Sequence, residues 1–166
     1  MRYAGIKEND IVDGEGICVS FWVQGCHHLC EGCHNPTTWS FTGGRELPET
    51  YKEDIYTLLN KNGIPRNLSV LGGEPLCEEN VGIVYDLIKY VKEKEASKKV
   101  YVWTGYLYEE IKSKYPYILE YVDVLIDGKF VLNKRDITLF LRGSSNQRVI
   151  DVQKSLKDNK VIIYHE

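Results

Sequence analysis

Apolar residues recur along the chain with two different periods, and the change of period predicts strands and helices in alternation. The β-branched and aromatic run at residues 17–23 is typical of a strand. An amphipathic stripe over residues 48–62, opened by a proline, predicts a helix. The short apolar run 67–71 predicts a second, buried strand, and the next helical face extends over residues 81–91.

The same alternation continues through the second half of the chain. Residues 99–104 predict a strand, residues 107–115 a helix that stops before a proline, and residues 122–126 another strand. The periodicity then weakens, and two short closing strands are expected near residues 149–150 and 161–163. The predicted order is therefore β-α-β-α-β-α-β with closing strands after it.

Such alternation indicates parallel strands joined by right-handed helical crossovers, which is the α/β class. A closed (β/α)₈ barrel typically takes about 250 residues, whereas this chain has 166. We therefore expect a single domain, residues 1–166, built as a partial β/α barrel of parallel strands that is open on one side. An open doubly wound sheet is the alternative. In both folds, functional residues belong at the carboxyl ends of the strands.

The composition fits a soluble globular protein, because 43% of the residues are hydrophobic and 27% are charged. Lys and Arg total 21 against 24 for Asp and Glu, so the net charge of -3 favours no nucleic-acid partner. No apolar run approaches the ~18 residues of a membrane span, and the charged N-terminus is unlike a signal peptide. We therefore expect a cytoplasmic protein with no nucleic-acid or membrane partner.

Three of the five cysteines lie within eight residues. Cys26, Cys30 and Cys33 have the spacing C-x3-C-x2-C directly after a predicted strand, so their thiolates can converge on one inorganic centre. Three ligands leave one iron of a 4Fe-4S cluster without a protein ligand, and an open iron can bind a substrate. The alternative is a zinc site completed by a histidine, for which the candidates are His27, His28 and His34.

A Gly-Gly-Glu-Pro segment follows the second predicted strand, at the edge of the sheet where the cysteine loop emerges. Gly72 and Gly73 let the backbone approach a ligand closely, and their carbonyls can accept from an ammonium group. Glu74 adds a negative charge. A simple turn is the alternative for this segment. The two cysteines outside the cysteine loop, Cys18 and Cys77, are expected to be ordinary buried thiols.

The cysteine motif followed by Gly-Gly-Glu-Pro resembles the radical S-adenosylmethionine enzymes. Further motifs across residues 10–152 are similar to the family of proteins that activate anaerobic ribonucleoside-triphosphate reductase. These motifs are Asp13-Gly14-Glu15-Gly16, Cys33-His34-Asn35-Pro36, Trp103-Thr104-Gly105-Tyr106, Asp127-Gly128-Lys129-Phe130 and the segment from Arg142 to Arg148.

The resemblance implies two cofactors, a 4Fe-4S cluster on the three cysteines and S-adenosyl-L-methionine at its open iron. It implies reductive cleavage to a 5′-deoxyadenosyl radical, which takes a hydrogen atom from a glycine in the large subunit of the reductase. It also implies an electron donor such as flavodoxin. The residues implied to bind S-adenosyl-L-methionine are Gly32, Cys33, His34, Gly72, Gly73, Glu74, Thr104, Asp127 and Lys129.

Two positions depart from the pattern of the resembled family. Gly32 stands where many superfamily members place an aromatic residue that packs on adenine, and Glu15 replaces a frequent proline. The rival functions are an activase of pyruvate formate-lyase or another glycyl-radical enzyme, and a small-molecule radical enzyme such as a deazapurine-forming synthase. From other classes come a zinc-binding module and an iron-sulfur electron carrier, which would need Cys77 as its fourth ligand.

Overall fold

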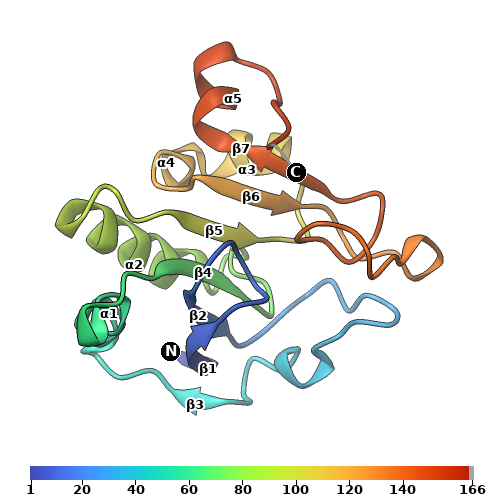
Figure 1. Ribbon diagram of the computed structural model, residues 1–166. Coiled ribbons are helices and arrows are strands. Elements are labelled where there is room, and N and C mark those ends of the chain that lie inside the picture. The colour runs from blue at the N-terminus through green and yellow to red at the C-terminus, as the bar shows by residue number, and fades with distance from the viewer. Residues whose placement is uncertain (165–166) are drawn as a thin grey trace.

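Seven strands form one mixed sheet in the computed structural model, which describes residues 1–164 (Figure 1). The order across the sheet is β3-β1-β2-β4-β5-β6-β7. The strands are β1 (Arg2–Asp10), β2 (Cys18–Val23), β3 (Arg45–Glu46), β4 (Asn67–Gly72), β5 (Val100–Trp103), β6 (Val124–Asp127) and β7 (Arg148–Asp151). The helices are α1 (Tyr51–Leu59), α2 (Val81–Lys94), α3 (Tyr108–Lys114), α4 (Pro116–Leu119) and α5 (Val152–Asp158), with short 3₁₀ turns at Pro36–Thr38, Lys61–Gly63 and Leu132–Lys134.

The middle of the sheet confirms the predicted α/β class. Strands β2, β4, β5 and β6 are parallel and are joined by helical crossovers, as the alternation predicts. The edges are antiparallel, with β1 and β3 on one side and β7 on the other, and the sheet does not close. The expectation of parallel strands throughout is therefore corrected at both edges.

Three strands differ from the prediction. Neither β1 nor the two-residue β3 was predicted, and the sequence of β1, RYAGIKEND, mixes charged and apolar residues without a clear alternation. The closing strand expected at residues 161–163 is reduced to a single bridge between Ile150 and Ile163. The other closing strand, at residues 149–150, is confirmed as part of β7.

The helices all cover one face of the sheet, and loops cover the other. Leu87 and Ile88 of α2 are fully buried in the larger apolar cluster, which also contains alternate residues of β5 such as Val102. Burying each such side chain contributes about 1.5–3 kcal/mol. On the opposite face, Tyr101 of β5 belongs to a smaller cluster, against which Leu141 packs from a long loop.

Two further observations concern the cysteines outside the cysteine loop and the length of the helices. Cys18 and Cys77 are both fully buried, which confirms them as interior thiols. Among the helices of residues 1–164, none is both long enough and apolar enough to cross a membrane.

A buried ion pair joins β6, β7 and α3. The side chain of Asp127 is fully buried and accepts hydrogen bonds from Arg148 Nε at 3.1 Å and from the backbone N–H of Tyr108 at 2.8 Å. Arg148 also pairs with the exposed Glu109 at 2.6 Å. Its hydrogen bonds to Asp127 and then Glu109 raise the pKa of Arg148. The same arginine thus has one buried and one exposed partner.

Replacing Arg148 with Met should lower the free energy of unfolding by about 3 kcal/mol, because it leaves the buried Asp127 carboxylate without its cation. Glu109→Gln should cost no more than about 1 kcal/mol, because that partner is exposed to solvent. Urea denaturation of both variants measures the difference. Equal losses in the two variants would show that the buried pair does not hold this edge of the sheet.

Candidate cofactor site

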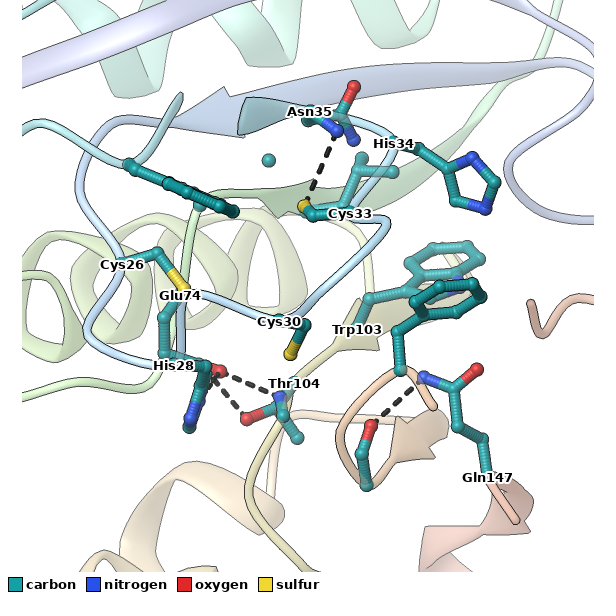
Figure 2. Close-up of a pocket in the computed structure, with 17 residues that line it drawn as sticks. Cys26, His28, Cys30, Cys33, His34, Asn35, Glu74, Trp103, Thr104 and Gln147 are labelled. Atoms are coloured by element: carbon teal, nitrogen blue, oxygen red, sulfur yellow. Dashed lines mark hydrogen bonds and ion pairs between the residues drawn. The ribbon is translucent and has the colours of Figure 1, made fainter. Parts of the chain in front are cut away.

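The loops that leave β2, β4, β5 and β6 meet at the carboxyl edge of the sheet and enclose a cavity of about 170 Å³ (Figure 2). Parallel strands place their carboxyl ends at one edge, so segments far apart in the sequence become neighbours there. In Figure 1 the loops after β2 and β6 extend on the same side, beyond the arrowheads. The cavity therefore lies at the edge of the sheet where functional residues are expected.

All three cysteines of the loop after β2 line this cavity. Burial raises the pKa of the thiols of Cys26 and Cys30. The sulfur of Cys33 accepts a hydrogen bond from the backbone N–H of Asn35 at 3.4 Å (Figure 2). Because thiolates are the ligands, binding of a metal centre here would be coupled to proton release. Three thiols on one cavity match the type and number of protein ligands of a 4Fe-4S cluster with one open iron.

The histidines beside these cysteines have other partners. His27 Nε2 lies 2.5 Å from a carboxylate oxygen of the exposed Glu79, and His28 Nε2 lies 2.7 Å from the buried Glu74. The ring of His34 packs on Phe130, with 5.2 Å between ring centroids. In residues 1–164, no three His, Cys, Asp or Glu side chains are arranged to bind a single metal ion. The histidines proposed as zinc ligands thus contact carboxylates or an aromatic ring.

Main-chain contacts fix the start of the cysteine loop. The N–H of Gly25 donates to the carbonyl of Thr38 at 2.7 Å, and the N–H of Cys26 donates to that of Trp39 at 3.1 Å. The N–H of Glu74 donates back to the carbonyl of Gly25 at 2.8 Å. The start of the loop is therefore attached to the Gly-Gly-Glu segment by a backbone hydrogen bond.

Glu74 is the most constrained side chain of the site. It is 1% exposed, and its two oxygens accept four hydrogen bonds from this chain (Figure 2). The partners, at 2.7 to 2.8 Å, are His28 Nε2, the N–H of Leu76, the hydroxyl of Thr104 and the N–H of Gly105. A carboxylate offers about four lone-pair positions. Glu74 therefore joins three loops, and a ligand ammonium could reach its oxygens only by replacing one of these donors.

The structure brings together most of the residues that the resemblance implies. Cys33, His34, Gly72, Gly73, Glu74 and Thr104 all line the cavity. Three others do not line it. Asp127 is buried in the ion pair with Arg148, and the side chain of Lys129 is exposed. Gly32 is exposed and faces Leu132, which lies 2.7 Å from where a Cβ would be.

Several lining residues were not predicted as cofactor contacts. Trp103, Phe130 and Gln147 all line the cavity, and Figure 2 labels Trp103 and Gln147. The amide of Gln147 donates to the carbonyl of Gly128 at 2.9 Å, so the two ends of the connection between β6 and β7 are held together. All three residues belong to motifs noted in the sequence, but the motifs alone did not say which side chains face a cavity.

Comparison with known proteins gives the family of the chain. A family model described as a 4Fe-4S single cluster domain matches residues 12–150. An anaerobic ribonucleoside-triphosphate reductase-activating protein from Pasteurella multocida (strain Pm70) is 41% identical over 150 residues, covering 89% of this chain and 95% of that protein. Proteins of the same name from Escherichia coli (strain K12) and Enterobacteria phage T4 are 36% and 38% identical, covering 90% of this chain and 97% and 93% of theirs. This chain belongs to that family.

Membership in the activating-protein family confirms the resemblance inferred from the motifs. The matched residues 12–150 contain every residue that lines the cavity. The description of the family model supports an iron-sulfur cluster in this domain. In the described chain, the cavity lined by three thiols has the sulfur ligands that such a cluster requires.

Gly73 is required by the packing of two loops of the activating-protein fold. A Cβ at this position would lie 2.3 Å from the carbonyl oxygen of Gly25 and 2.9 Å from that of Thr38. Gly73→Ala should therefore separate the cysteine loop from the Gly-Gly-Glu segment. We expect a loss of about 1–3 kcal/mol in the free energy of unfolding, as for other overpacked sites, together with weaker iron binding on reconstitution.

The matched control is Gly82→Ala in α2, where a Cβ would meet nothing within 4 Å. Alanine is the better helix former by about 0.5–1 kcal/mol, so this variant should be slightly more stable. Denaturant unfolding and iron content measure both variants. A stable Gly73→Ala protein with full iron content would contradict the packing argument.

Two carboxylates near the start of β2 make stability depend on pH. Burial, and next the neighbouring Asp10, raise the pKa of Asp13 from 3.8 to about 7. Burial alone would also raise the pKa of Asp10, but hydrogen bonds from Asp13 and Val12 outweigh it and lower that pKa to about 2. At a pH between the unfolded value of 3.8 and the folded value of about 7, folding is therefore accompanied by binding of a proton at Asp13.

The free energy of unfolding should fall as pH rises from about 4 to 7 and then level off, because the unfolded chain releases the proton that folded Asp13 keeps. Asp13→Asn should remove this slope, whereas Asp86→Asn, on the exposed side of α2, should keep it. Urea denaturation across this pH range makes the comparison. A slope that survives in Asp13→Asn would assign the proton to another group.

Proposed function

We propose that this protein is an iron-sulfur oxidoreductase of the radical S-adenosylmethionine class that activates anaerobic ribonucleoside-triphosphate reductase. Its product would be a glycyl radical in the large subunit of that reductase. The observation that carries the proposal is that three cysteines line one cavity at the strand ends, in a chain similar over about nine tenths of its length to reductase-activating proteins.

Cys26, Cys30 and Cys33 would hold a 4Fe-4S cluster and leave one iron open for S-adenosyl-L-methionine. The chemistry that the bound cluster supplies is one-electron reduction of this sulfonium, which yields methionine and a 5′-deoxyadenosyl radical. The protein residues contribute placement, since well-oriented reactants avoid much of the entropic barrier.

The carbonyls of Gly72 and Gly73 would accept hydrogen bonds from the methionine ammonium group, because both residues line the cavity beside the cysteines. Glu74 would act mainly by holding these loops, because its oxygens are already occupied by donors of the protein. Thr104 would complete the methionine or ribose end of the site.

Trp103 and Phe130 would take the place of the missing aromatic residue at Gly32. Both rings line the cavity, and a stacked aromatic contact suits the flat face of adenine. His34, which packs on Phe130, would border the same subsite. Asp127 and Lys129 would support the loop after β6 without touching the cofactor.

The remaining features of the proposal concern the protein as a whole. The open sheet would be a partial β/α barrel forming one domain over residues 1–166. The protein would act in the cytoplasm, with flavodoxin or a similar protein as electron donor, and with neither a nucleic acid nor a membrane as partner.

The test is anaerobic reconstitution with iron and sulfide, followed by a strong reductant, S-adenosyl-L-methionine and the reductase. Electron paramagnetic resonance should show an organic doublet, and its splitting should collapse when the glycine is α-deuterated. Alanine at any of Cys26, Cys30 or Cys33 should abolish the signal and the cluster absorbance. Cys77→Ala, which changes a buried thiol outside the cavity, should keep both.

Two results would contradict the proposal. Bound zinc with no cleavage of S-adenosyl-L-methionine would refute a radical enzyme. Cleavage with no radical on the reductase, but with activation of a formate-lyase-type enzyme, would identify a different protein substrate.

A further inference from the structure

A second hollow of about 500 Å³ adjoins the cofactor cavity. The two lie side by side, because six residues line both: His34, Asn35, Leu71, Trp103, Phe130 and Gln147. The outer wall of the second hollow comes from two segments that the cofactor proposal does not use. These are the residues around Val12 and the loop 135–143.

The outer wall carries the most exposed large apolar side chains of the described chain. Ile137 is 84% exposed and Val12 is 75% exposed, and both line the hollow. Next to Val12, Ile11 is 74% exposed. Single exposed apolar residues are common, but apolar residues gathered around a hollow are typical of interaction sites.

The loop that presents Ile137 is held in place at its base. The indole N–H of Trp103 donates to the carbonyl of Leu141 at 2.8 Å. The N–H of Asp136 donates to the carbonyl of Gly143 at 3.1 Å, and the N–H of Ser145 donates to that of Lys134 at 2.9 Å. Leu141 packs on the sheet, whereas Ile137 projects to solvent. Ile137 is therefore exposed on a loop whose base is held by hydrogen bonds.

The chemistry of the proposed function requires an entry of this kind. Hydrogen-atom transfer needs the reacting atoms about 3–3.5 Å apart, so the glycine of a protein substrate must reach the cofactor cavity itself. Strand ends and the cysteine loop line that cavity, and the second hollow lies directly beside it. Because glycine has no side chain, a segment seated in the second hollow could bring its main chain close to the shared lining, and the neighbours of the glycine would then contact Val12 and Ile137.

We propose that the hollow between Val12 and the loop 135–143 is the docking groove for the glycine-bearing segment of the reductase, with Ile137 as an apolar anchor. The inference rests on the proposed function, which supplies the occupant. The groove takes a main-chain segment with apolar side chains on either side of the glycine. Val12 and Ile137, which would recognise this segment, do not line the cofactor cavity.

The test compares Ile137→Lys with Ile64→Lys in the full chain. Ile64 is also exposed, at 43%, but lies between the turn Lys61–Gly63 and β4, at the amino end of the strands. Binding to the purified reductase is measured by calorimetry. For Ile137→Lys, loss of one buried isoleucine should raise the dissociation constant at least about tenfold. The Ile64→Lys variant should bind as the unaltered protein does, and Ile137→Leu should restore most of the affinity.

Activity is measured alongside binding. Ile137→Lys should reduce the glycyl-radical yield while 5′-deoxyadenosine formation without the reductase stays at the level of the unaltered protein. If the variant does not fold, as judged by its thermal transition, Val12→Lys tests the other wall of the groove. Normal reductase binding by a folded variant would overturn the proposal.

Two further outcomes separate this proposal from its alternatives. If Ile137→Lys abolishes only self-association in gel filtration, the groove binds a second copy of this chain and the docking proposal is overturned. If the unaltered protein binds the reductase but never cleaves S-adenosyl-L-methionine, the proposed function fails. The binding comparison between Ile137→Lys and Ile64→Lys then still decides where the reductase docks.

Discussion

The site depends on one buried carboxylate. Glu74 accepts from His28 of the cysteine loop, from the N–H of Leu76 in its own segment, and from Thr104 and Gly105 after β5. A buried carboxylate is costly unless its oxygens are hydrogen-bonded. The same requirement forces three loops from different strands to meet at one point. Any change that removes a donor would leave charge unsatisfied and would also separate the loops.

The sequence was a good guide to what depends on periodicity and spacing. The parallel middle of the sheet follows from apolar runs with two periods, and its carboxyl edge then fixes where the cysteine loop and Gly72 to Glu74 meet. Strand β1 was missed because it lies next to the two-residue β3 near the sheet edge and carries few fully buried residues. An edge position of this kind imposes no strict alternation of polar and apolar residues.

Side-chain partners were harder to predict. Asp127 follows a strand and has a charge, so its position resembles that of a ligand contact, yet Arg148 lies directly opposite it in the β6–β7 register. Nothing local in the sequence shows that pairing, because the two residues are separated by a loop. The opposite error concerns two aromatic residues that the sequence did not predict as cofactor contacts. Trp103 and Phe130 were noted as motif residues, but only the fold shows that both face the cavity.

The hydrogen bonds of the cysteine loop affect how much of its folding would depend on an inorganic cofactor. In small zinc domains the metal supplies the free energy that folds the ligand loop. Here the ends of the cysteine loop are held by the protein, through Gly25, Cys26 and the contact of His28 with Glu74. Burial nevertheless raises the thiol pKa values of Cys26 and Cys30, which favours the protonated form of these two thiols. Under the proposed function, cofactor binding would therefore be coupled to deprotonation of buried thiols in a loop that the protein's own hydrogen bonds also hold.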